Sequence, residues 1–334
     1  DMDYITDRYN EGKQSNHAVF ASMESQLPND FTASYGVRYT YVDSEMSKAS
    51  ASQNGYQTMS TPRGTFTTPF NNRDDGSAGK TGSNHNDHFV FNAGLTWTGI
   101  EDLALRATWS QGFRAPLLQE KYLQNNMGGG SVQGNPDLKP ETSDNFELGA
   151  RFNRGPIHVD VTSFYSMADD YITKDLTNAN TNSSRYINAD KAKTFGIEAS
   201  LAYTLMDRYT PYVTVTTMRR KLEKQGYSTY ESGTPALFAR YGLKTNHELF
   251  GGVLTTDTYA RSQTATKTYS YSTDETTRIA GFTSFNFGAG YRFGKNGNYA
   301  VDAEFLNIFN QTYQYSTSSY EAGRSFNVKL TAHY

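Results

Sequence analysis

The 334-residue sequence contains no cysteine, and this absence excludes disulfide scaffolds, thiolate metal sites and cysteine nucleophiles. No apolar run approaches about 18 residues, so no transmembrane helix is expected. An excess of basic residues is missing too. The 31 Lys and Arg face 34 Asp and Glu, and a formal net charge of −3 offers no basic field for binding nucleic acid. No stretch with a basic start and an apolar core, the mark of a signal peptide, is visible at the N-terminus.

The balance of apolar residue types is unusual for a soluble protein. Only 36% of residues are hydrophobic, yet 25 Tyr, 20 Phe and 2 Trp raise the aromatic share to 14%. A soluble core of this size would be rich in Leu, Ile and Val. Few aliphatic and many aromatic side chains instead favour strands whose apolar side faces something other than a thick protein core.

Apolar and polar residues alternate through most of the sequence, which predicts β-strands with two different faces. Phe31, Tyr35 and Tyr39 share one face of the segment 31–42, and Arg38 and Thr40 share the other. The same alternation recurs in segments 17–27, 89–97, 103–110, 145–152, 157–165, 195–203, 285–293 and 326–334. Segments 209–220, 235–244 and 251–262 alternate less regularly, so their register stays open. In all, we expect about 13 strands of roughly ten residues, the length of a tilted membrane-crossing strand.

The connections between these strands are short on one side and long on the other. Short turns are expected at 28–30, 99–102, 153–156, 206–208 and 294–298, whereas 43–86 and 113–142 read as long polar loops. Strand charges take the polar face, and aromatic residues gather near strand ends, as in outer-membrane barrels. The sequence therefore predicts an all-β fold, a transmembrane antiparallel β-barrel formed by residues 1–334 as a single domain. The rival interpretation is a soluble β-sandwich such as a lectin.

The odd number of strands indicates that further strands belong to the barrel. An open sheet would leave two unpaired edges in lipid, where each unsatisfied backbone group costs several kcal/mol. We therefore expect this chain to be the C-terminal part of a larger barrel.

Two motifs between strands resemble those of TonB-dependent outer-membrane receptors, as do the segment 307–313 and the terminal aromatic strand. Their residues are Phe113, Arg114, Ala115 and Pro116 in the first motif, Asn135, Pro136, Asp137 and Leu138 in the second, and Tyr334 at the end of the last strand. The resemblance covers essentially the whole chain. It implies a barrel of about 22 strands around an N-terminal plug, with the last strands present here and the plug absent.

The same resemblance implies a place in the bacterial outer membrane and capture of a scarce iron complex at the outer face. It implies three further partners: outer-membrane lipid, the TonB–ExbB–ExbD energy-coupling complex acting through the plug, and the barrel-assembly machinery reading the terminal strand. We expect TonB-coupled uptake of a ferric siderophore, with no intrinsic cofactor. The alternatives are a haem or haemoprotein receptor of the same fold and a passive porin. No GxSxG or HExxH spacing is present, and no enzymatic activity is expected.

Candidate ligand-contact residues follow from the chemistry of an anionic, aromatic iron chelate. Arginine pairs with carboxylate or catecholate oxygens, and tyrosine stacks on aromatic groups. The candidates near the outer rim are Arg114, Tyr122, Tyr171, Arg185 and Tyr186. The two motifs themselves are interpreted as structural: Pro116 stops a strand, Arg114 ties the loop base to a neighbour, and 135–141 is a turn that starts a strand.

Histidine is the residue type that tests the haem alternative. In haem receptors of the resembled family a ligand histidine lies between the two motifs, and the corresponding residues 117–133 contain none. His85 and His88, near the outer end of another strand, are the alternative haem or metal ligands. Two histidines in a polar loop are more often simply solvated.

Overall fold

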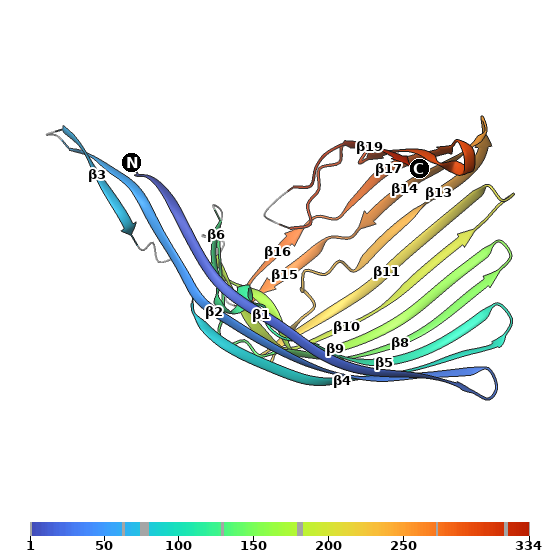
Figure 1. Cartoon of the computed structure of the whole chain (residues 1–334), viewed down its shortest axis with the longest axis horizontal. Helices are drawn as coiled ribbons and strands as arrows, with labels where there is room; N and C mark the ends of the chain where they lie inside the picture. The colour runs from blue at the N-terminus through green and yellow to red at the C-terminus, as the bar shows by residue number, and fades with distance from the viewer. Residues whose placement is uncertain are drawn as a thin grey trace.

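Most of the described chain is β-strand. The computed structural model describes residues 2–61, 64–73, 80–127, 130–178, 183–271, 273–316 and 320–333. Thirteen long strands pair antiparallel with the next along the chain and form one curved wall (Figure 1). They are β1 (Met2–Leu27), β2 (Phe31–Thr61), β4 (Gly82–Ile100), β5 (Leu103–Arg114), β8 (Glu141–Arg154), β9 (Ile157–Asn178), β10 (Ser183–Tyr203), β11 (Tyr209–Lys224), β13 (Leu237–Leu249), β14 (Gly252–Gln263), β17 (Phe282–Phe293), β18 (Tyr299–Leu306) and β19 (Ser325–Ala332).

Short elements lie in the connections, all but one of them at the long-loop end of this wall. Strand β3 (Gly64–Arg73) pairs with β2, β12 (Tyr227–Thr229) pairs antiparallel with β11, and β15 (Thr266–Ser270) forms a separate hairpin with β16 (Glu275–Ile279). Helix α1 (Leu118–Tyr122), β6 (Gln124–Met127) and β7 (Gly130–Gln133) lie between β5 and β8. The 3-10 turn η1 (Lys295–Gly297) joins β17 to β18. Within the described ranges, neither helix is long and apolar enough to cross a membrane.

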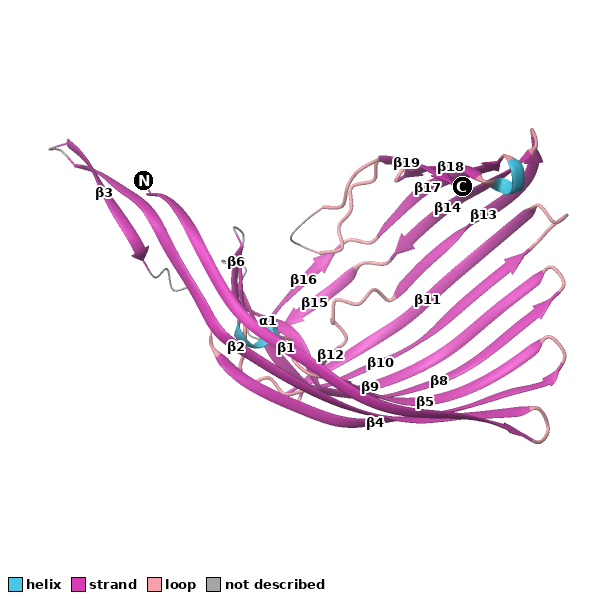
Figure 2. Ribbon diagram, in the orientation of Figure 1, coloured by secondary structure: helices cyan, strands magenta, loops and turns pink. Residues whose placement is uncertain are grey.

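The predicted short turns are confirmed, and they gather at one rim of the wall (Figure 2). Phe250 and Gly251 join β13 to β14 with φ angles of 49° and 74°, so both occupy the left-handed region. A two-residue turn of this kind matches the right-handed twist of its flanking strands. The hairpins therefore close tightly at this rim, and long connections are confined to the other.

The long-loop side differs from expectation in residues 43–86. Strands β1 and β2 stay paired from Leu27 and Phe31 out to Met2 and Gln57, so much of the predicted loop is strand. This segment of β2 is rich in Ser, Thr, Ala and Gln, so its sequence shows no regular alternation of apolar and polar residues. The two strands of an antiparallel hairpin satisfy each other's backbone hydrogen bonds. The hairpin can therefore continue beyond the part of the sequence that alternates between apolar and polar residues.

The apolar faces of the strands point outward and remain exposed. Phe89 is 55% exposed, Phe91 48% and Leu148 65%, with no second layer of the described chain over them. The alternate positions carry polar side chains such as Arg106, whose guanidinium Nη2 donates to Thr162 Oγ1 at 2.7 Å across three strands. The fold is a β-barrel wall with a lipid-facing exterior and a polar lumen, as predicted, and the β-sandwich interpretation is wrong.

Candidate ligand-binding site at the long-loop end

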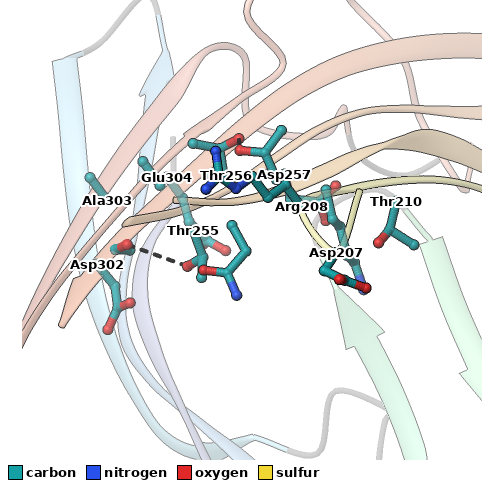
Figure 3. A pocket seen from close by; sticks show the side chains of 15 residues that line it. Asp207, Arg208, Thr210, Thr255, Thr256, Asp257, Asp302, Ala303 and Glu304 are labelled. Carbon is teal, nitrogen blue, oxygen red and sulfur yellow. Dashed lines mark hydrogen bonds between the residues drawn. The ribbon is translucent and has the colours of Figure 1, made fainter. Parts of the chain in front are cut away.

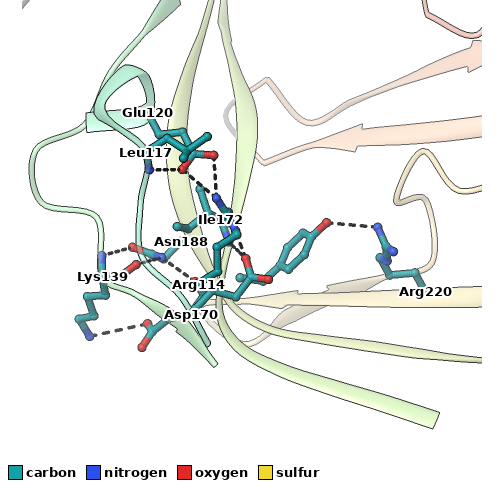
Figure 4. Close-up of polar contacts among 10 residues, drawn as sticks. Arg114, Leu117, Glu120, Lys139, Asp170, Ile172, Asn188 and Arg220 are labelled. Atoms are coloured by element: carbon teal, nitrogen blue, oxygen red, sulfur yellow. Dashed lines mark hydrogen bonds and ion pairs between the residues drawn. The ribbon is translucent and has the colours of Figure 1, made fainter. Parts of the chain in front are cut away.

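The first motif fixes the base of the loop between β5 and β8. Arg114 Nη1 donates to both Glu120 carboxylate oxygens, at 3.0 and 2.9 Å, and its Nη2 donates to Glu141 Oε2 at 3.2 Å (Figure 4). Glu120 Oε2 also accepts the Leu117 backbone N–H at 2.9 Å, which holds the start of α1. Pro116 is fully buried beside them. Arginine at the end of β5 thereby joins the loop helix to the start of β8.

The second motif is hydrogen-bonded to the neighbouring strand β10. Asn135 Nδ2 donates to the Tyr186 carbonyl at 3.1 Å, and Arg185 Nη2 donates to Asn135 Oδ1 at 2.9 Å. Asn188 makes a reciprocal pair with the backbone of Lys139, at 3.0 and 3.2 Å. Both motifs therefore hold loops against strands, in keeping with their structural interpretation.

Lys121 adds a buried cation to this loop base. Its side chain donates to the Leu138 carbonyl at 3.2 Å, and both residues are 4% exposed or less. Burial lowers the pKa of Lys121 below its ordinary value, and the nearby Asp137 carboxylate offsets only part of this. The ammonium group therefore acts inside the loop base and is not presented to solvent.

The predicted ligand-contact residues do not form one open surface. Arg114 and Arg185 are engaged in the loop base, which Tyr186 enters only through its backbone carbonyl. Tyr122 is 4% exposed, so burial raises the pKa of its phenol. Tyr171 packs against the buried side chains of Ala168, Ala192 and Leu222, and its hydroxyl accepts a hydrogen bond from Arg220 Nη1 at 3.2 Å. Their role as ligand contacts stays a prediction. Tyr334 lies outside the described residues.

The structure separates the two histidines of the haem or metal alternative. His85 and His88 both lie in the continuous strand β4, three positions apart, so their side chains face opposite sides of the sheet. His85 stacks on Tyr41 at 6.4 Å between ring centroids, and His88 stacks on Phe113 at 5.2 Å. The expectation that their spacing allows a shared metal is therefore corrected by strand geometry. Over the described ranges, no group of three His, Asp or Glu side chains gathers as a metal site.

A group of three tyrosines that the sequence interpretation missed lies on the polar side of the long-loop end. Tyr227 stacks on Tyr269 with ring centroids 4.8 Å apart, and Tyr271 meets both edge-on at 5.9 and 5.3 Å. We call these residues the tyrosine cluster. Lys224 Nζ lies 5.6 Å from the Tyr271 ring centroid, and Tyr227 is 49% exposed. The cluster thus offers aromatic faces and a cation at the mouth of the lumen.

The cluster forms because the β15–β16 hairpin folds back onto β9. Tyr271 N donates to Asp175 Oδ1 at 3.0 Å, and Ser270 Oγ donates to the Leu176 carbonyl at 3.2 Å. Tyr271 also packs on the buried group Ala168, Ala192 and Leu222 from three adjacent strands. The Tyr269–Ser–Tyr271 spacing was the one available sequence signal, but nothing in the sequence placed it beside Tyr227.

The pKa values of Tyr269 and Tyr271 are both raised, so these two phenols stay protonated at physiological pH. Burial, together with the Asp175 carboxylate, raises the pKa of Tyr271 to about 12. A hydrogen bond to Asp274, 2.8 Å from the Tyr269 hydroxyl, raises the pKa of Tyr269 as well. Neutral phenols donate hydrogen bonds and stack, and a raised pKa makes the phenolate that would bind ferric iron harder to form. The arrangement suits recognition of an intact chelate.

Replacing Asp175 with alanine is expected to release the β15–β16 hairpin. The carboxylate is 5% exposed and accepts from the hairpin backbone, so its loss leaves the Tyr271 N–H without this partner. Loss of such a bond costs about 1–3 kcal/mol, and amide exchange across Thr266–Ile279 should accelerate about tenfold or more. Asp175→Asn, which keeps an acceptor oxygen, should change exchange far less. Equal exchange in the alanine variant and the wild type would contradict this tether.

A second hollow lies at the opposite, short-turn end of the wall (Figure 3). Its charged lining consists of Asp207, Arg208, Lys244, Asp257, Asp302 and Glu304. Asp257 is already paired, because it accepts from Arg240 Nη2 at 2.8 Å and from the Tyr212 hydroxyl at 2.9 Å. The hollow faces away from the long loops, so we place ligand capture at the tyrosine cluster instead.

Comparison with known proteins places this geometry in a family. The family model described as "TonB dependent receptor-like, beta-barrel" matches residues 1–310. Among solved structures, the copper transporter OprC superposes with a TM-score of 0.70 at 16% identity, covering 96% of this chain and 48% of that one. At this identity the likeness concerns the fold alone.

Curated relatives are named for iron or haem acquisition. The iron-regulated outer membrane virulence protein of Vibrio cholerae is 33% identical over 143 residues, 37% of this chain and 21% of that protein. The ferric aerobactin receptor of Klebsiella pneumoniae is 28% identical over 218 residues, 61% of this chain and 27% of the receptor. The heme/hemopexin utilization protein C of Haemophilus influenzae is 26% identical over 285 residues, 77% of this chain and 39% of that protein. The chain thus spans well under half the length of these relatives.

Proposed function

Because the chain belongs to the TonB-dependent receptor-like β-barrel family, we propose that it is part of an outer-membrane receptor that takes up a ferric siderophore. The observation that carries this proposal is the tyrosine cluster beside Lys224, at the long-loop end of a barrel of this family. Aromatic faces and cations bind an anionic chelate by stacking and charge. The proposed receptor acts without catalysis, with the TonB complex working through a plug and the assembly machinery inserting the barrel.

A haem receptor of the same fold is the second candidate, because the Haemophilus influenzae relative covers 77% of this chain. Two observations weigh against it. Residues 117–133 between the motifs contain no histidine, and His85 and His88 face opposite sides of β4. A siderophore needs no axial ligand from the protein, whereas haem iron is commonly held by one. Membership of an actively coupled family also disfavours a passive porin.

Ligand binding by the full-length receptor with its native plug tests the proposal. Ferric catecholate, ferric hydroxamate and haem are titrated separately against the protein in detergent. We expect tight binding of one ferric siderophore and weak binding of haem. Tight haem binding without siderophore binding would replace the proposed function with the haem alternative.

Tyr227→Ala tests whether the tyrosine cluster contacts the chelate. Each lost aromatic or cation contact is worth about 0.5–1.5 kcal/mol, so Tyr227→Ala combined with Lys224→Gln should weaken siderophore binding roughly tenfold. Tyr227→Phe keeps the stacking ring and is the matched control, expected to stay close to wild type. Unchanged affinity in the double variant would show that the tyrosine cluster does not contact the siderophore. The proposed receptor function would still stand.

A further inference from the structure

Aromatic side chains on neighbouring strands form a girdle on the lipid-facing side of the wall. Cross-strand Cα partners join Trp109 to Phe146, Phe146 to Tyr165, Tyr165 to Phe195 and Phe195 to Arg219. Aromatic residues on the lipid-facing side gather at the boundary between hydrocarbon and headgroups. Strand β11 begins at Tyr209 on the short-turn rim, and Arg219 lies ten positions further along it. At about 3.3 Å per residue and a tilt of about 40°, this is roughly 25 Å, the height of the apolar band, so Arg219 stands at the headgroup boundary.

Three lysines lie directly above this girdle on the same face. Lys193 is the cross-strand partner of Lys221, two positions outward from Phe195 and Arg219, and Lys191 lies two positions further out on β10. Same-face residues recur about 7 Å apart along a strand, and neighbouring strands lie about 4.8 Å apart. We call Lys191, Lys193, Arg219 and Lys221 the basic patch, which extends roughly 14 Å along the strands.

The carboxylates near the basic patch do not neutralise it. Glu223 Oε1 accepts from both Lys193 Nζ and Lys221 Nζ, at 3.2 and 3.3 Å, and Asp169 lies 3.8 Å from Lys191. Arg219 is exposed, and no hydrogen bond or ion pair engages its side chain within the described residues. Four cations against two carboxylates leave an excess of positive charge on a surface turned toward lipid.

Among the described residues, the cations of this face cluster on β10 and β11. Asp144 lies in the same cross-strand row as Lys193 and accepts the Trp109 indole N–H at 3.0 Å. On β4, Asp87 accepts from the Tyr39 hydroxyl at 3.2 Å. These acidic residues stand on the same lipid-facing side, above the girdle on other strands. A general need for charge at the membrane boundary therefore does not account for the basic patch.

We propose that the basic patch binds the phosphate groups of a phosphorylated lipid in the outer leaflet. Clustered Lys and Arg beside a membrane recognise anionic headgroups, and the arginine fork pairs with phosphate oxygens. The acyl chains of the lipid lie below, along the exposed Phe195 and Ile197 side chains, which are 41% and 47% exposed. The wall thus offers cations at the headgroup level and apolar side chains below them, in the same order as the phosphates and acyl chains of a lipid.

Native mass spectrometry of the full-length receptor in detergent tests this site, with bis-phosphorylated lipid A as the probe. A cation near a lipid surface contributes roughly fivefold to affinity, so Lys193→Gln, Arg219→Gln and Lys221→Gln combined should weaken binding at least about tenfold. Glu223→Gln removes a competing carboxylate and should strengthen binding. Lys295→Gln, on the short-turn rim, is the control and should leave binding unchanged.

Dephosphorylated lipid A separates phosphate recognition from nonspecific contact. The wild type should bind it more weakly, and the triple variant should bind both lipids alike. The heat-dependent shift of the folded barrel on a gel shows that each variant is assembled. Equal binding of lipid A by the wild type and the assembled triple variant, or no preference of the wild type for the phosphorylated form, would overturn the proposal.

Discussion

Replacing Leu148 with arginine in the full-length receptor is expected to lower the free energy of unfolding by about 2–4 kcal/mol, the cost of a lipid-facing cation at mid-depth. Leu148 is 65% exposed on β8 and lies between Ala107 and Ser163 of the flanking strands, inside the aromatic girdle. The arginine side chain would either lose its hydration in the hydrocarbon or pull its strand toward the headgroups, and both outcomes destabilise the folded barrel. Urea unfolding of the receptor in lipid vesicles measures the loss.

Thr108→Arg is the matched control for this substitution. Thr108 pairs with Glu147, the residue next to Leu148, but it faces the lumen, where Glu147 lies opposite. The same cation at the same depth should cost less than about 1 kcal/mol there. Equal losses from the two arginines would show that the two faces of β8 do not meet different surroundings.

Replacing Arg114 with alanine is expected to free the loop base between β5 and β8. The two carboxylates it binds, Glu120 and Glu141, have side chains only 10% and 19% exposed. Removing one partner of a buried pair costs about 3–5 kcal/mol. Because the Arg114 side chain is 39% exposed, we expect water to offset part of this and leave about 2 kcal/mol. Amide exchange in α1 should then accelerate on the order of 30-fold.

Arg114→Lys distinguishes charge from geometry at this position. Lysine keeps the positive charge but cannot bind both carboxylates with a planar fork, so exchange in α1 should fall between the wild type and the alanine variant. Exchange that is unchanged in the alanine variant would mean that the loop base is held by the Asn135 and Asn188 contacts alone.

The strands were predictable wherever their faces differ in chemistry. Alternation located Phe89 and Phe91 on the outside of β4 because lipid on one side and water on the other impose a period of two. The outer part of β2 is rich in small and polar residues with no apolar alternation, so its sequence does not mark it as a strand. The less regular segments near β11 and β13 are strands as expected, with a register fixed by their neighbours.

The candidate site was predictable only in its local part. Turn chemistry and a strand-ending proline pointed to the structural role of the motif residues around Pro116 and Asn135. The tyrosine cluster depends on a hairpin at residue 270 that contacts Asp175 about a hundred positions earlier. No local pattern records such a contact. The same holds for the basic patch, because lysines on neighbouring strands become one surface only once the register is known.

Neighbouring residues of each membrane-crossing strand face lipid and water in turn. The region contains no cysteine, so single cysteines at Glu147, Leu148, Gly149 and Ala150 of the full-length receptor can carry nitroxide spin labels. In lipid vesicles, labels at 148 and 150 should collide mainly with dissolved oxygen, and labels at 147 and 149 mainly with a water-soluble nickel chelate. Accessibility that does not alternate, or that alternates with the opposite phase, would contradict the account.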